Sequence, residues 1–208
     1  LSLRDRSCGP YHPGFFCGAG NETAPLLTMF VSPRGGGQFL RDGRAELKLS
    51  NVSFSNAHLA GSVYGAYHTA PGGRGLIDLT GSLTRADARF VGRYIPLVVN
   101  AETRDWLDRA ILSGGSRDVR LRVKGNLADF PFADGNRGIF QVTAKVSGGT
   151  LLYAEGWPKI ESLAADLTFR GARMEIAAHQ GALYGARLAK VRAVVPDMLH
   201  HDELLEVE

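Results

Sequence analysis

Apolar and polar residues alternate along most of the chain between Arg44 and Val195. From Val119 to Lys124, three apolar residues alternate with arginine and lysine, and from Phe140 to Ser147 they alternate with glutamine, threonine, lysine and serine. A period of two places the apolar side chains of a strand on one face of its sheet and the polar side chains on the other. The pattern therefore predicts a sheet with one apolar and one polar face.

Turn-forming residues divide this pattern into short strands. The first begins at Arg44, and its alternation changes phase across Asn51; Leu59–His68 and Gly75–Leu83 follow. Strands resume at Ser116 and continue to Val195, and the same alternation recurs in Leu163–Phe169 and Met174–Ala178. The 26 glycines among 208 residues exceed the usual share of about 7 % and lie mostly between apolar runs. This arrangement is typical of an antiparallel all-β meander with many turns.

Two segments depart from the period of two. Apolar residues of Arg85–Ile95 recur every three to four positions, and Pro96 ends that run. Asn100–Leu112 has one apolar stripe, with Asn100 as a plausible N-cap and Gly114–Gly115 as the stop. These segments predict two short helices inserted between residues 85 and 113.

The predicted fold is mainly β: a curved, mostly antiparallel, open sheet with an apolar concave face and two short inserted helices. We divide the chain into three parts. Residues 1–40 are rich in breakers and are expected to be poorly ordered or non-native, with Gly35–Gly37 as a flexible spacer. Residues 41–198 form the sheet, and residues 199–208 form an acidic tail that is helical or frayed. Because the chain begins without a Met or a leader, we interpret it as a fragment of a longer protein.

Composition narrows the class of protein. Charged residues make up 22 % and apolar residues 44 %, as in an ordinary globular chain. The net charge of +3 is spread through the strands, which does not favour a nucleic-acid partner. No run approaches the roughly 18 apolar residues of a membrane span. Cys8 and Cys17 are the only cysteines, and a disulfide or two free thiols remain equal alternatives.

The sequence contains no recognisable catalytic or cofactor motif. None of its six histidines is spaced for zinc, and its carboxylates are scattered around turns. It has no Gly-x-Ser-x-Gly elbow and no phosphate-binding loop. We therefore expect no catalytic residue, metal or cofactor. Trp106 and Trp157 are interpreted as packing anchors, and Phe130–Phe132 as a turn that plugs one end of the sheet.

Several ordered motifs carry a family resemblance. They are Leu79–Asp87, Arg93–Pro96, Thr103–Leu107, Gly125–Phe132, Phe140–Val146, Leu152–Ile160 and Arg173–Ile176. In this order and spacing they resemble the YhdP family of AsmA-like envelope proteins, over about residues 43–198. The first 40 residues do not resemble that family.

The resemblance implies a large protein of the Gram-negative envelope, anchored in the inner membrane with its bulk in the periplasm. Such proteins resemble long sheets curled into an open groove and are implicated in moving phospholipid towards the outer membrane. The implied partners are phospholipid acyl chains, and a membrane reached through parts of the parent protein outside this fragment. The helical pair is expected to cap one mouth of the groove or to form its wall. The candidate groove residues are Leu47, Leu49, Val119, Leu121, Val123, Phe140, Val142, Val146, Leu167, Phe169, Met174 and Ile176.

Two other functions stay open. The chain could be a purely structural module whose apolar face is filled by its own helices and by neighbouring repeats of the parent protein, since most apolar sheet faces pack on another sheet or a helix. It could also be a carbohydrate-active β-sandwich enzyme, which would require two carboxylates about 5–10 Å apart in a cleft. A sealed apolar face favours the first, and a paired set of carboxylates favours the second.

Overall fold

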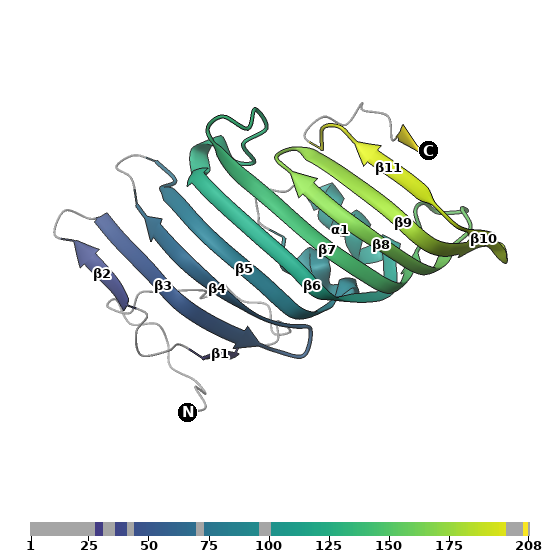
Figure 1. Cartoon of the computed structure of the whole chain (residues 1–208), viewed down its shortest axis with the longest axis horizontal. Helices are drawn as coiled ribbons and strands as arrows, with labels where there is room; N and C mark the ends of the chain where they lie inside the picture. The colour runs from purple at the N-terminus through teal and green to yellow at the C-terminus, as the bar shows by residue number, and fades with distance from the viewer. Residues whose placement is uncertain are drawn as a thin grey trace.

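The computed structural model describes residues 28–30, 36–40, 44–69, 73–95, 101–198 and 206–207. These residues form one antiparallel sheet of 12 strands, with two helical segments on one side (Figure 1). Its strands run in the order β1-β3-β4-β5-β6-β7-β8-β9-β11-β12, so that each strand from β3 to β9 pairs with the next along the chain. The predicted open antiparallel meander is confirmed.

The seven long strands carry the body of the sheet. They are β3 (Arg44–Ser55), β4 (Leu59–His68), β5 (Leu76–Asp87), β6 (Ile111–Asn126), β7 (Gly138–Leu151), β8 (Ile160–Arg170) and β9 (Arg173–Leu183). Beyond β9 lie β10 (Ala186–Leu188), β11 (Val191–Val195) and β12 (Glu206–Val207). A bulge between Leu49 and Val52 in the pairing of β3 with β4 confirms the phase change predicted at Asn51.

At the other edge, two short strands share the outer side of β3. β2 (Gly36–Leu40) pairs with Arg44–Lys48, and β1 (Thr28–Phe30) pairs with Ser53–Ser55. The assignment of Gly35–Gly37 to a flexible spacer is therefore wrong for Gly36 and Gly37, because glycine can join a ladder through its backbone alone. Residues 1–27, with both cysteines, lie outside the described part of the chain.

The helical insertion is shorter than predicted. β5 continues to Asp87, and only residues 88–93 turn, as the 3₁₀ helix η1 (Ala88–Arg93). Cross-strand pairing of Ala86 with Ser116 and of Asp87 with Gly115 outweighs the helical spacing here. The second helix, α1 (Ala101–Ala110), ends before its predicted stop, and β6 begins at once and runs through Gly114–Gly115. Gly114 has φ +125°, which suits it to the register shifts in this part of β6.

The tail also differs from expectation at one point. Glu206–Val207 forms β12 and pairs with Val194 and Ala193 of β11 rather than forming helix.

The buried apolar core of the described chain is small for a sheet of this size: Val52, Leu59, Ala110, Val123, Phe132, Ala165, Ala172 and Val194. Most apolar side chains of the sheet are therefore not sealed in a core.

Candidate functional site

The twelve candidate groove residues lie on one face of the sheet. Directly paired residues of antiparallel strands point to the same side, so the register links side chains into rows across the strands. The first row is Leu49, Gly65, Leu79, Val123 and Phe140. The second is Val52, Val63, Gly81, Leu121, Val142, Phe169, Met174 and Val195. The third is Phe54, Gly61, Leu83, Val119, Ala144, Leu167, Ile176 and Ala193. We call these three rows the floor.

Two further rows flank the floor and hold the remaining candidates. On one side, Leu47 pairs with Tyr67, and the row continues to Ile77, Gly125 and Gly138. On the other side, Val146 lies in a row with Leu59, Ala86, Ser116, Ala165, Ala178 and Val191. The sheet therefore brings all twelve residues together, as the period of two predicts.

The middle of the floor is open. Leu79, Leu121 and Val142 are only partly buried. On the opposite face Thr80, Gln141 and Thr143 are also partly buried, whereas Ser82 and Arg120 are exposed. Of the twelve candidates, only Val123, at 9 % exposure, belongs to the buried core. Side chains sealed beneath a second layer would be almost fully buried, so the floor is not a sealed core.

One end of the floor is walled by the turn that follows β6. Phe132 is 2 % exposed and lies over the two glycines of the first flanking row. A methyl group on Gly125 would lie 2.8 Å from the Phe132 ring, and one on Gly138 would lie 2.5 Å from it. The Phe130 ring is 4.9 Å from that of Phe140, the last residue of the first floor row. Phe130–Phe132 therefore closes this end, as the sequence predicts.

Hydrogen bonds and ion pairs hold this turn in place. Asn126 caps the 3₁₀ turn η2 (Leu127–Asp129) by accepting from the Ala128 amide at 3.0 Å. Arg137 then pairs with Asp129 at 3.1 Å and with Asp134 at 3.3 Å. The wall is thus fixed by its own polar contacts as well as by the Phe132 ring.

The opposite end of the floor is covered by η1 and α1. Three residues of the second flanking row, Leu59, Ser116 and Ala165, are exposed by only 8 %, 8 % and 2 %. In Figure 1 α1 lies behind the sheet, and it packs against η1 and β6. The backbone amide of Leu152 donates to the Ala110 carbonyl at 2.8 Å, and the Trp106 indole donates to the Tyr153 carbonyl at 2.9 Å. These contacts tie α1 to the end of β7.

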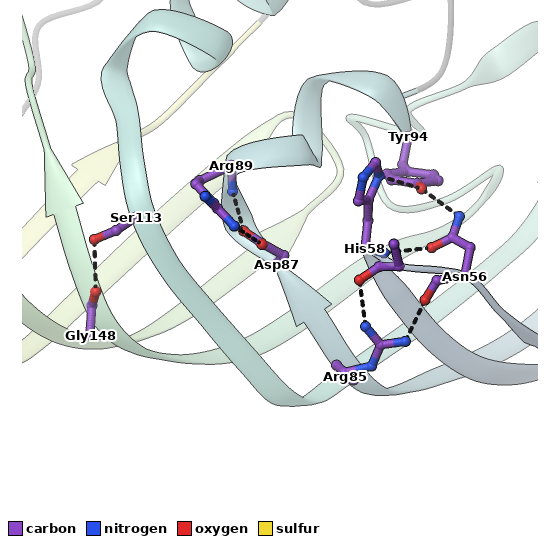
Figure 2. Close-up of polar contacts among 9 residues, drawn as sticks. Asn56, His58, Arg85, Asp87, Arg89, Tyr94, Ser113 and Gly148 are labelled. Atoms are coloured by element: carbon purple, nitrogen blue, oxygen red, sulfur yellow. Dashed lines mark hydrogen bonds and ion pairs between the residues drawn. The ribbon is translucent and has the colours of Figure 1, made fainter. Parts of the chain in front are cut away.

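The turn between β3 and β4 anchors η1 (Figure 2). His58 stacks on Phe90 with ring centroids 3.6 Å apart, and the Asn56 amide donates to the Tyr94 hydroxyl at 2.8 Å. Arg85 donates to the carbonyls of Ala57, at 2.6 Å, and Asn56. The predicted helical pair thus forms a wall at one end of the strands, opposite the Phe130–Phe132 turn.

Arg89 pairs with Asp87 at 2.6 Å, where β5 passes into η1. The hydrogen bond from Arg89 lowers the pKa of the Asp87 carboxyl below its usual value, and partial desolvation opposes this. The charged pair therefore helps to fix the start of the helical wall at neutral pH.

The tryptophans contribute less to packing than predicted. Trp106 is 36 % exposed and Trp157 is 62 % exposed, and each contacts Tyr153 at ring distances of 6.0 and 5.8 Å. Trp157 is therefore not a core anchor. It follows β7 in a connection that no second layer covers.

The polar face contains a hollow that the sequence did not reveal. It has a volume of about 780 Å³ and lies over β4 to β7. Its polar lining residues alternate with those of the floor, and Gly81, Leu83, Val119 and Leu121 of the floor strands complete the lining. The polar side of the sheet is therefore hollowed at this place. Nearby, Arg122 hydrogen-bonds Asp78 and lowers the pKa of that carboxyl, and Lys124, at 3.4 Å, adds to the effect.

No recognisable reaction centre accompanies these faces. Within the described ranges, no three His, Cys, Asp or Glu side chains converge as a metal site would require. None of the helices in that part of the chain has the length and hydropathy to cross a bilayer. The arrangement offers binding surfaces, one apolar and one polar.

Comparison with known proteins decides the family. A family model described as YhdP protein matches residues 38–208. The chain belongs to the YhdP family. No curated protein and no solved structure matches it. The matched range begins inside β2, so the family region includes both walls and every strand of the sheet from β3 to β12, and β1 lies outside it. Membership implies a transport-related protein of the bacterial envelope rather than one of an enzyme family.

Proposed function

We propose that this YhdP-family segment carries phospholipid acyl chains along its floor, as one stretch of a path between the inner and outer membranes. The observation that supports it most is the partial exposure of the central floor between two walled ends. A structural module sealed by its own helices would have buried these residues beneath them.

The dimensions of the floor suit hydrocarbon chains. Strands lie about 4.8 Å apart, so the seven long strands span about 29 Å across the sheet. A bilayer core of about 30 Å holds two acyl chains end to end, so one chain needs about 15 Å. The three rows are two residues apart along each strand, which makes the floor about 14 Å wide. Two chains of one lipid can lie side by side in this width, since carbon atoms in contact are about 4 Å apart.

The energetics require no chemistry. Each methylene removed from water gains about 0.8 kcal/mol, and a head group can remain in water beyond the floor. Because this free-energy gain depends on the apolar area that is buried and not on direction, an acyl chain can slide along the rows without breaking specific bonds. We infer that the segment is not an enzyme, and that it works in the periplasm as part of a protein tethered to the inner membrane.

Photocrosslinking tests the proposal on the whole 208-residue chain. A photoreactive amino acid at Leu121 would be compared with the same residue at Ser82, on the neighbouring strand and the opposite face. The chain would be expressed in a Gram-negative host, irradiated, and analysed for covalently attached lipid. We expect phospholipid on the Leu121 variant and none on the Ser82 variant. Equal labelling at both positions, or none at Leu121, would overturn the proposal.

A charge substitution gives a second test. Leu121→Asp is expected to remove co-purified phospholipid, detected by native mass spectrometry, while far-UV circular dichroism shows a folded sheet. Ser82→Asp adds the same charge to the solvated face and is expected to retain the lipid. Unfolding by Leu121→Asp alone would mean that this position is sealed core and would favour the structural module.

A further inference from the structure

Two polar rows cross four strands on the face opposite the floor. The first consists of Ser62, Ser82, Arg120 and Thr143, and the second of Tyr64, Thr80, Arg122 and Gln141. Together with Arg117, Asp118 and Thr84 they line the hollow of about 780 Å³. Each row places its neutral polar groups on both sides of one arginine of β6.

The charge of the hollow is positive. Arg117, Arg120 and Arg122 contribute three cations to its lining, and Asp118 is its one carboxylate. Arg122 is engaged by Asp78 and by the Leu79 carbonyl. Arg120, whose side chain is 77 % exposed, gives only its Nε–H to Asp118, at 3.2 Å.

Arg117 is also exposed, and none of the described carboxylates pairs with it. Two guanidinium groups therefore keep unused donors that face the same hollow. Paired N–H donors of this kind match carboxylate and phosphate oxygens.

The neutral groups of the hollow indicate a ligand that is larger than a small anion. Tyr64 is 54 % exposed and presents both an apolar ring and a hydroxyl group to the hollow. The hydroxyls of the serines and threonines and the Gln141 amide add donors and acceptors in rows spaced about 4.8 Å apart. A lone phosphate would use the arginines and leave these groups unused. A sugar chain with acidic substituents would use all three kinds of contact.

We propose that this hollow binds an acidic saccharide, with sugar rings against Tyr64 and across the hydroxyl rows and with its carboxylate or phosphate groups on Arg117 and Arg120. The volume lies within the range of small-ligand sites, about 300–1,000 Å³, and admits a short oligosaccharide. With Asp118 as the one carboxylate of the lining, the hollow lacks the pair that glycoside hydrolysis requires, so the site binds rather than cleaves. The proposal concerns the face opposite the floor and does not depend on lipid transport.

Isothermal titration calorimetry on the 208-residue chain tests the site. The probes are trigalacturonate, a neutral galactose trisaccharide, inorganic phosphate and hexaglutamate peptide. We expect trigalacturonate to bind at least tenfold more tightly than each of the other three. Raising the salt concentration should weaken this binding, since it depends on exposed charges.

Matched variants locate the binding. Arg117→Gln and Arg120→Gln should each weaken trigalacturonate binding about tenfold, and Tyr64→Ala should weaken it several-fold. Arg187→Gln and Tyr184→Ala, which change exposed residues outside the hollow, should leave it unchanged. Absence of trigalacturonate binding would overturn the proposal, as would equal binding of phosphate or hexaglutamate. Equal losses in the control variants would also overturn it.

Discussion

Replacing phenylalanine at two places on the apolar face distinguishes a wall from an open floor. Phe132 is 2 % exposed beneath its own turn, whereas Phe169 is partly exposed in the second floor row. Full burial of a phenylalanine side chain is worth about 1.5–3 kcal/mol in transfer free energy. Phe132→Ala would also leave a cavity between the turn and the glycines beneath it, so we expect a total loss of about 3–4 kcal/mol.

Phe169→Ala should cost less. Part of its side chain is exposed to water in the folded chain. The space freed by the substitution therefore opens to solvent and does not form a cavity. We expect a loss of about 1–2 kcal/mol in the free energy of unfolding.

Urea unfolding followed by far-UV circular dichroism measures both losses. With a slope of about 1–3 kcal/mol per molar urea, Phe132→Ala should lower the midpoint by at least about 1 M, and Phe169→Ala by about half as much or less. The ratio of the two shifts does not depend on the slope if the slope is unchanged. A loss for Phe169→Ala equal to or greater than that for Phe132→Ala would refute the reasoning, because it would make the floor a sealed core.

Three further substitutions or conditions test other parts of the structure. Gly138→Val should destabilise the chain by about 2 kcal/mol or more, measured by urea unfolding, because its side chain would collide with the Phe132 ring. Asn56→Ala should cost about 1–2 kcal/mol in the same assay, through loss of its bonds to the amides of His58 and Leu59, at 2.8 and 2.9 Å. The pKa of Asp78 is lowered in the folded chain, so its contribution to stability is complete above about pH 4 and is lost as the pH falls below that value. Unfolding at a series of pH values should show this loss, and Asp78→Asn should reduce it; an unchanged pH profile would contradict the pairing with Arg122.

The strands and the facing of their side chains were predictable from the sequence. The period of two identified every strand from β3 to β9, and Leu59–His68 was predicted with its observed bounds. Alternation also placed all twelve groove candidates on one face, because the register follows from hairpin connections between neighbouring strands. The phase change at Asn51 could be located because only a bulge keeps both halves of β3 on the same face.

Other features depend on contacts between distant residues. The spacing of Arg85–Ile95 is helical, but pairing with β6 extends β5 to Asp87. The glycines of β2 carry no side-chain pattern, so their pairing with β3 could not be inferred from alternation. Predicting the hollow on the polar face would require knowing that the arginines of β6 lie between the polar residues of β5 and β7. That arrangement depends on register and not on any single strand.

The divided edge of β3 has a consequence for self-association. A long, regular edge strand exposes backbone N–H and C=O groups that can pair with a strand of another molecule, and sheets aggregate through such pairing. Here the outer partners of β3 are two short pieces, β2 and β1, and they meet it at opposite ends. A foreign strand could not add along the full length without displacing both. On the proposed function, the apolar floor can therefore stay exposed for hydrocarbon while this edge resists the growth of fibres.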